Sequence, residues 1–349
     1  MNNVSSKSKP RNLKSRSLGG LLDEKFKPRE ELLAPWLTQR HLSMVYAPAG
    51  VGKSWFALSA ALAVAGGGKL YHWDAPIARR VVFVDGEMDI EDLQERCEKL
   101  IEPLDVNIKT ARNNLLFLAQ QDQSLDVEFP DLATDEGQAI VMKHIKNHRA
   151  EFVILDNFST LCEVEDENAA SSFNPIMRFL RQLKQGRIAA MLVHHARKNT
   201  SGNGSYRGTS KQAVIFNSII SLNHPDRIPA QGGATFDIDF EKYRGLRDDR
   251  VAPVRVSLQN DPGERPQWVV EPRSDAKIVE MVRAVKELAC ASQDELAERF
   301  GVTKGTISKW KRRAIDMDLV SSKAWEECLK EAQQVREEEE HAVSDVSNF

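Results

Sequence analysis

The sequence lacks most of the features that mark secreted and membrane proteins. It has four cysteines in 349 residues, which show neither the density of a disulfide framework nor the pairing of a metal site. No run of about 18 apolar residues is present, so no transmembrane helix is expected. The basic N-terminus is not followed by the apolar segment of a secretory signal. These absences predict a cytoplasmic protein with no membrane partner.

A large net charge of either sign is also absent, since the formal charge is −3. With 41% hydrophobic and 28% charged residues, the chain has the composition of an ordinary globular protein, long enough for one large α/β domain and a small second one. The charge is unevenly distributed: the first twenty residues are basic, and Glu337 to Glu340 form an acidic block. Residues 1–28 are expected to be a disordered basic tail.

The most informative stretch is 43–62, SMVYAPAGVGKSWFALSAAL. A short apolar run leads into a glycine loop, Gly-Lys-Ser, and an Ala-rich helical segment, which fits the Walker A pattern with Ala47 at its first position. Such a loop turns backbone N–H groups onto phosphates, and the helix N-terminus adds partial positive charge. The sequence therefore predicts a nucleoside triphosphate site. Its candidate ligands are Ala49, Gly50, Val51, Gly52, Lys53, Ser54 and Trp55.

Two downstream apolar runs end in carboxylates. Asp156 closes the run 152–155 in the Walker B form and, after a Walker A, is expected to hold Mg²⁺ with Ser54. Glu87 follows the buried run 81–84, where open α/β sheets place their ligands, and is a candidate to orient or deprotonate the attacking water. A helix N-cap cluster of Asp85, Glu87 and Asp89 explains the second position equally well.

A third apolar run, 189–193, ends in His194 and His195. A metal site is disfavoured because no third ligand lies at a recognisable spacing, so a polar contact with the γ-phosphate is preferred. The following segment, 196–211, is cationic and rich in Gly, Ser and Asn, as expected of a functional loop and not of a core segment. Arg207 in this loop is too exposed by composition to be a packing residue.

The repeated alternation of strand and helix predicts a mostly parallel sheet flanked by helices over residues 29–260. Residues 261–275 are Pro-rich and predicted to be a linker. Residues 276–321 are expected to form a small all-α (winged) helix-turn-helix domain, and residues 322–349 a helical acidic tail. In the helix-turn-helix, Ala297 is small where two helices cross, Gly301 makes the turn and Ile307 anchors the second helix.

The second helix of this motif carries the candidate DNA contacts, and spacing and charge favour duplex binding over a small bundle with a basic solvated face. These candidates are Lys304, Thr306, Lys309, Lys311 and Arg312.

From about Pro35 to Leu258 the chain resembles the RepA-type hexameric replicative helicases of plasmids and mobile elements, within the RecA-like ATPases. The resemblance lies in the strings PWL, YAPAGVGKS, RRVVFVDGEM, LATDEGQ, VILDNFSTL, LVHHARK, YRGTS and FEKYRG. It implies an ATP- and Mg²⁺-dependent hexameric ring with single-stranded DNA in its channel.

The same resemblance assigns roles to residues. Glu87 corresponds to the catalytic glutamate, and His194 or His195 to the γ-phosphate sensor. Arg207 is similar to an arginine finger that enters the neighbouring subunit's site, and Lys242 and Arg244 to a second cationic pair at that interface. In this reading the loop 196–211 lines the channel, with Arg197 and Lys198 against the DNA.

Two other functions fit the same motifs. One is a DNA-binding replication initiator or regulator that uses ATP only to switch its oligomeric state, which the helix-turn-helix favours. The other is a RecA-like recombination mediator or a helicase loader, which would form open filaments or bind a partner helicase.

Overall fold

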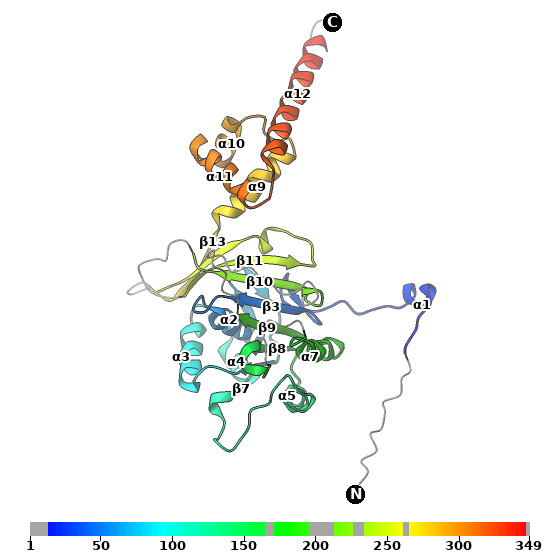
Figure 1. Ribbon diagram of the computed structural model, residues 1–349, viewed down its shortest axis with the longest axis vertical. Coiled ribbons are helices and arrows are strands. Elements are labelled where there is room, and N and C mark those ends of the chain that lie inside the picture. Colours follow the sequence, from blue (N-terminus) through cyan, green and yellow to red (C-terminus); the bar gives the residue numbers. More distant parts are fainter. Residues whose placement is uncertain (1–12, 165–170, 196–212, 226–233, 261–264, 347–349) are drawn as a thin grey trace. The chain divides into compact units, whose positions relative to one another are not determined.

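Nine of the apolar runs form one sheet. The computed structural model describes residues 13–164, 171–195, 213–225, 234–260 and 265–346, and within them the strand order is β13-β12-β11-β10-β3-β9-β8-β6-β7 (Figure 1). The strands from β10 to β7 run parallel, and β11, β12 and β13 continue the sheet antiparallel. This confirms the predicted fold class. The strands are β3 (Leu42–Ala47), β6 (Val81–Asp85), β7 (Leu115–Ala119), β8 (Phe152–Asp156), β9 (Ala189–His195), β10 (Ser218–Asn223), β11 (Thr235–Tyr243), β12 (Val254–Gln259) and β13 (Gln267–Pro272).

Helices cover both faces of the parallel strands (Figure 1). On one face lie α2 (Lys53–Gly66), α3 (Ile90–Ile101) and α4 (Ile108–Asn114); on the other lie α5 (Asp135–His148), α6 (Phe158–Leu161) and α7 (Asn174–Gln185). Helix α2 is buried on almost every side, which its many alanines permit because small side chains let the helix approach the sheet closely. A short 3₁₀ helix, η1 (Gln120–Asp122), follows β7.

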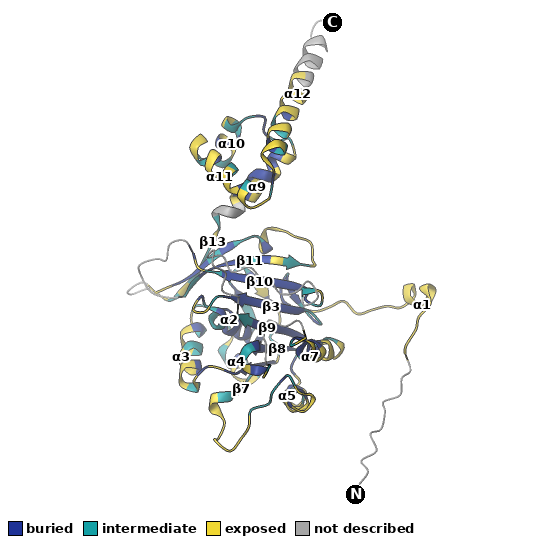
Figure 2. Cartoon of the chain, in the orientation of Figure 1, coloured by how far each residue is buried: buried dark blue, intermediate teal, exposed yellow. Residues whose placement is uncertain are grey.

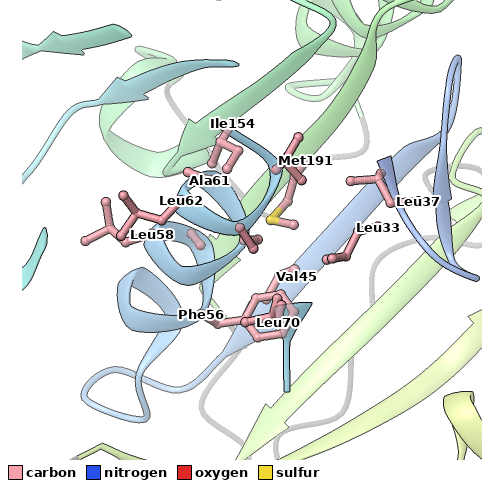
Figure 3. Close-up of a cluster of buried hydrophobic side chains, with 14 of the residues drawn as sticks. Leu33, Leu37, Val45, Phe56, Leu58, Ala61, Leu62, Leu70, Ile154 and Met191 are labelled. Carbon is pink, nitrogen blue, oxygen red and sulfur yellow. The ribbon is translucent and has the colours of Figure 1, made fainter. Parts of the chain in front are cut away.

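The core is divided by the sheet into two apolar clusters, and buried residues run along the central strands (Figure 2). Figure 3 shows part of the first cluster, where Phe56 and Leu58 of α2 lie with Val45 of β3, Ile154 of β8 and Met191 of β9. Because successive residues of a strand point to opposite faces, each central strand contributes to both clusters.

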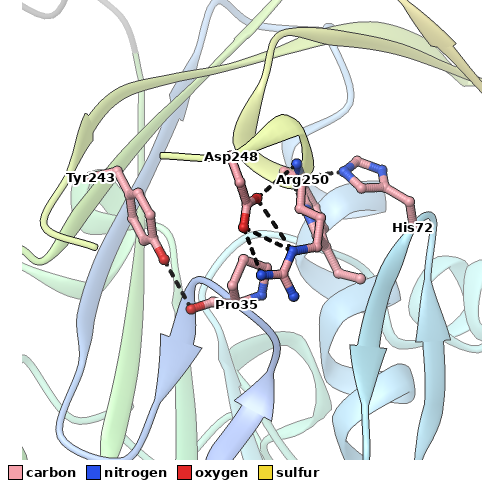
Figure 4. Close-up of polar contacts among 6 residues, drawn as sticks. Pro35, His72, Tyr243, Asp248 and Arg250 are labelled. Atoms are coloured by element: carbon pink, nitrogen blue, oxygen red, sulfur yellow. Dashed lines mark hydrogen bonds and ion pairs between the residues drawn. The ribbon is translucent and has the colours of Figure 1, made fainter. Parts of the chain in front are cut away.

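Two hairpins border the first cluster: β1 (Glu31–Leu33) with β2 (Leu37–Thr38), and β4 (Gly68–Leu70) with β5 (Trp73–Ala75). The 3₁₀ turn η2 (Asp249–Val251) is tied to them by hydrogen bonds (Figure 4). The carbonyl oxygen of Arg250 lies 2.8 Å from His72 Nε2 and accepts from Trp73 Nε1 at 2.6 Å, while Tyr243 Oη donates to the Pro35 carbonyl at 3.1 Å. These bonds fix the end of β11 to the amino-terminal part of the domain.

Part of the predicted linker 261–275 belongs to the sheet. Residues Gln267–Pro272 form β13 and pair with β12, and Trp268 packs against Tyr71 and Phe236 with ring centroids 5.1 and 6.0 Å apart. The prolines concealed this strand in the sequence. Pro266 precedes it and Pro272 is its last residue, so neither interrupts the ladder.

Residues from Ser274 to Val346 form α9 (Ser274–Lys286), α10 (Gln293–Phe300), α11 (Lys304–Asp316) and α12 (Ser322–Val346), and no strand that would make a wing lies among them. Ala297 and Ile307 are buried, and Gly301 has a left-handed φ of 61° at the end of α10, as the motif predicts. The predicted division at residue 321 differs from the structure, because Trp325 of α12 is fully buried in the same cluster as Ile307.

The first thirty residues form a separate unit, whose described part contains the short helix α1 (Leu18–Leu22), capped by the Ser17 side chain. Leu18, Leu22 and Phe26 of this unit are exposed. The predicted tail 1–28 lies partly outside the described residues. Within the described part of the chain, no helix is both long and apolar enough to cross a membrane.

Candidate nucleotide site

The sequence-predicted site forms where four parallel strands end. The register pairs Ala47 with His195 and Asp85 with Asp156, so the glycine loop after β3 and the ends of β6, β8 and β9 share one edge of the sheet. Parallel α/β sheets bind ligands at this edge. A cavity of about 240 Å³ lies there. It is lined by Ala49, Gly50, Gly52, Lys53, Ser54, Trp55, Glu87, Arg96, Asp156, Asn157 and His195.

The glycine loop needs its glycines for two reasons. Gly50 and Gly52 have φ values of 79° and 124°, which side chains other than hydrogen rarely tolerate. A Cβ at Gly52 would also lie 2.7 Å from the Phe236 ring. Val51 differs from the other predicted ligands, because its side chain is buried in the core below the loop. Any phosphate contact from Val51 would therefore come from its backbone N–H.

Lys53 lies across the loop, with Nζ donating to the carbonyl oxygens of Ala47 and Pro48 at 3.3 and 3.2 Å. Burial lowers the pKa of Lys53, although the carboxylates of Asp156 and Glu87 oppose that shift. The ammonium thus lies between the loop and the two acidic strand ends. A side chain in this position is able to reach the phosphates of a nucleotide held by the loop.

Asp156 and Ser54 have the chemistry that a Mg²⁺ ion requires. The Ser54 hydroxyl hydrogen-bonds to Asp156, while Asp156 Oδ2 is buried and has no hydrogen-bond partner among the described residues. Burial raises the pKa of Asp156 to about 7, and the Asp85 carboxylate adds to the rise. A cation beside Oδ2 would satisfy this oxygen and favour its charged form. The described residues contain no cluster of three or more His, Cys, Asp or Glu that could hold a metal ion.

The sequence left two explanations for Glu87, a site residue or a member of an N-cap cluster with Asp85 and Asp89, and the structure gives Glu87 and Asp85 different roles. Asp85 is buried, and its Oδ1 accepts from the backbone N–H groups of Glu87 and Met88 at 3.1 and 2.7 Å. Burial raises the pKa of Asp85, against the effect of these two hydrogen bonds. Glu87 instead projects into the cavity and accepts from Asn157 Nδ2 at 2.7 Å. Asp85 therefore shapes the turn, and Glu87 is the carboxylate available to a ligand.

The two histidines lie in different environments because they alternate along β9. His195 lines the cavity. The His194 ring instead packs edge-on against Phe158 and Phe173, with centroids 5.4 and 5.3 Å away. Of the two predicted γ-phosphate contacts, the structure thus brings only His195 to the cavity.

Lys242 and Arg244 are not at this edge. Tyr243 pairs with Ser218 at the start of β10, and Ser218 pairs with Ser43 near the start of β3, at the opposite end of the strand from the glycine loop. Lys242 Nζ donates to the Ala213 carbonyl at 2.5 Å and Arg244 to that of Val214 at 2.6 Å. Burial lowers the pKa of Lys242, and the neighbouring Arg244 lowers it further. Neither cation serves the glycine loop of its own chain.

Two residues at the cavity were missed by sequence reasoning, Asn157 and Arg96. Arg96 comes from α3 and lies over the Trp55 ring, 5.7 Å from its centroid. No motif spacing marks Arg96. Asn157 directly follows the Walker B aspartate, but nothing in the sequence indicates that it contacts Glu87. Arg197, Lys198 and Arg207 lie outside the described residues.

The predicted DNA contacts on α11 differ in their exposure and in their partners. Lys309 and Arg312 are exposed, whereas the Lys311 side chain is only 21% exposed and contacts Glu326 at 3.6 Å and the Trp325 ring. Lys304 forms an exposed ion pair with Asp294 at 2.5 Å, and the Thr306 N–H donates at 3.3 Å to Oγ1 of Thr303, the N-cap residue of α11. Lys311 therefore attaches α11 to α12 within this domain.

Two family models match parts of the chain. Residues 7–201 match the model of the AAA domain family, and residues 281–331 match that of the bacteriophage CI repressor helix-turn-helix domain. A solved structure of a KaiC-like protein from the hyperthermophilic archaeon Pyrococcus horikoshii OT3 is 14% identical, with a TM-score of 0.47 over 69% of this chain and 94% of that chain. No curated protein matches the sequence.

The mostly parallel sheet, the glycine loop before α2 and the carboxylates at neighbouring strand ends define an α/β fold of the P-loop class. The chain belongs to the AAA domain family, whose model covers more than half of its length. It also carries a helix-turn-helix domain of the phage CI repressor type.

The buried Asp156 generates a stability prediction. Its pKa of about 7 lies above its ordinary value of 3.8, so ionisation disfavours the folded state and stability falls as the pH rises through that interval. Without nucleotide or metal, Asp156→Asn is expected to stabilise the fold at pH 8, by up to on the order of 4 kcal/mol, and to have little effect near pH 4.

Calorimetric unfolding in EDTA at both pH values measures this difference. Asp126→Asn, at an exposed position, is the matched control and is expected to leave Tm unchanged at both. An Asp156→Asn protein no more stable than wild type at pH 8 would contradict the burial cost.

Proposed function

We propose that the chain is a ring-forming, Mg²⁺-dependent ATPase that couples ATP hydrolysis to translocation on DNA, as a replicative helicase of the RepA type. One observation carries the ATPase part of this proposal: a single cavity unites Lys53 and Ser54 of the glycine loop with Asp156 and Glu87 of neighbouring strand ends. The proposal includes a cytoplasmic location and a hexameric ring.

In this mechanism the loop amides hold the β- and γ-phosphates, and Lys53 exchanges its carbonyl partners for phosphate oxygens. Ser54 and Asp156 would hold Mg²⁺, which when bound neutralises the charge developing on the phosphates. Glu87 accepts a proton from the attacking water or orients it, and His195 contacts the γ-phosphate. Each of these side chains already lines the cavity, so little rearrangement within the chain is required.

The ring part of the proposal concerns the cations that this chain does not bring to its own loop. Lys242 and Arg244 lie at the opposite end of the strands, where a neighbouring subunit could receive them. Arg207 is proposed to enter the same neighbouring site as an arginine finger. Assembly would then be part of the chemistry, because the nucleotide site of an isolated subunit would lack these charges.

The DNA part follows from two cationic regions. The loop with Arg197 and Lys198 is proposed to contact the backbone of single-stranded DNA in the channel. Helix α11 is proposed to dock on duplex DNA through Lys309, Arg312, Lys304 and Thr306, and to determine where the ring loads. Lys311 is omitted from these contacts because it packs against α12.

A second function, an ATP-switched DNA-binding regulator, is favoured by the match of residues 281–331 to the phage CI repressor domain. A RecA-like recombination mediator or a helicase loader is a third candidate function. Strand displacement on a forked DNA substrate separates them: a motor unwinds the fork with ATP and Mg²⁺, and a regulator or loader alone does not.

The in-trans site predicts the behaviour of Arg207→Ala. This variant is expected to bind ATP normally and to lose about 10³-fold or more of its turnover, because an arginine finger contributes roughly 10³–10⁵ in rate. Mixed with Lys53→Ala subunits, which supply the finger but cannot bind the phosphates, it should regain part of the activity.

ATPase assays across mixing ratios measure this complementation, and Arg265→Ala, at a side chain 83% exposed, is the control. Full turnover of the Arg207→Ala protein, with no dependence on mixing, would contradict a shared site.

The helix-turn-helix predicts a salt-dependent affinity for duplex DNA. Lys309→Ala and Arg312→Ala are each expected to weaken binding and to reduce the slope of log affinity against log salt by about one. Lys323→Ala, at an exposed lysine of α12, should change neither. Fluorescence anisotropy with a labelled duplex, at salt concentrations from about 50 to about 200 mM, measures the affinity and its salt dependence. Proteins that contact several phosphates lose much of their affinity over this range. Equal losses in all three variants would refute a specific role of α11.

A further inference from the structure

The turn that carries Glu87 is joined to the turn that carries Asp156. The Gly86 N–H donates to the Asp156 carbonyl at 2.9 Å. A Cβ at Gly86 would lie 2.5 Å from Thr160 Oγ1 and 2.9 Å from Leu161 Cδ2, so only glycine lets the Asp85-Gly86-Glu87 turn pack this closely on α6. The backbone at the end of β6 is therefore held against the end of β8 and the start of α6. This leaves the side chain of Glu87 as the movable part.

Asn157 is the residue that contacts this side chain. It is 1% exposed, and its Oδ1 accepts from the Thr160 N–H at 3.3 Å as the N-cap of α6. Its Nδ2 donates to Glu87 Oε2 at 2.7 Å. Only one orientation of the amide satisfies both bonds, because the cap needs an acceptor and the carboxylate needs a donor. The cap thus fixes the direction in which the NH₂ group points.

We infer that Asn157 is a positioning residue for Glu87, and that it holds the carboxylate at the cavity in the geometry needed to act on the attacking water. This inference rests on the proposed ATPase function. Glu87 is exposed and has three side-chain torsions, so without a fixed donor it would populate several orientations. A donor to an ionised carboxylate is a strong hydrogen bond, and buried supporting residues of this kind commonly contribute about 10–100-fold to activity.

The competing explanation is that Asn157 serves only α6 as its cap. The two roles use different atoms of one amide and can be separated by substitution. Asn157→Ser and Asn157→Asp both retain a side-chain oxygen of the type preferred at an N-cap. Neither offers Glu87 the donor: serine is one bond shorter, and aspartate replaces the NH₂ group with an oxygen. Asn157→Ala removes both functions and serves as the reference for loss of the cap.

The test compares steady-state ATP hydrolysis and ATP affinity in the full chain. Asn157→Ser and Asn157→Asp are expected to lower kcat about 10–100-fold, with the Ser variant keeping Kd for ATP within about twofold. Thr160→Val is the matched control, since it removes the reciprocal capping bond but leaves the Asn157–Glu87 contact, and should keep kcat near wild type. In a Glu87→Gln background, Asn157→Ser should cost no further rate, because both changes act through one group.

Wild-type kcat in both the Ser and the Asp variants would overturn the inference, as would an equal loss of rate in the Glu87→Gln background. A wild-type protein without ATP turnover would instead overturn the proposed function, and the inference with it.

Discussion

The candidate site depends on the parallel register of β3, β9, β8 and β6. Parallel strands that start in register also end in register, and here each end carries a polar residue: the glycine loop after Ala47, His195, Asp156 and Asp85 with Glu87. A one-residue slip of any strand would reverse its faces and move its polar end out of the group. The two apolar clusters prevent such a slip, because each strand supplies side chains to both. The packing of the sheet and the geometry of the site are therefore the same constraint.

This arrangement concentrates charge where water is scarce. Lys53, Asp85 and Asp156 are all buried, and burial opposes the charged form of each: it lowers the pKa of the lysine and raises the pKa values of the two carboxyl groups. A fold selected only for stability would not keep such a group of charges under an open cavity. A nucleotide with its metal ion supplies charges of both signs to the same place, which gives the arrangement a physical reason.

Sequence reasoning found the residues that follow an apolar strand and missed those defined by contacts across the sheet. Lys53, Ser54 and Asp156 were predicted from the Walker A and Walker B patterns and Glu87 from its place after a buried strand, and the structure brings all four to one cavity. Asn157 and Arg96 were missed because their partners, Glu87 and Trp55, lie far away in the chain. The sequence did not distinguish His194 from His195. In the structure they point to opposite faces of β9, and only His195 lines the cavity. The prolines concealed β13, and the polar composition of α12 concealed the buried Trp325.

The most direct test of this account measures ATP binding and ATP turnover side by side in the wild-type and Glu87→Gln proteins with Mg²⁺. Both proteins are expected to bind ATP with the same Kd, since Lys53, Ser54 and the loop are unchanged. Turnover is expected to fall by at least about 10²-fold in the variant, because this is the smallest contribution typical of a general base. Equal turnover in the two proteins would contradict the role of Glu87, and failure of both to bind ATP would contradict the site itself.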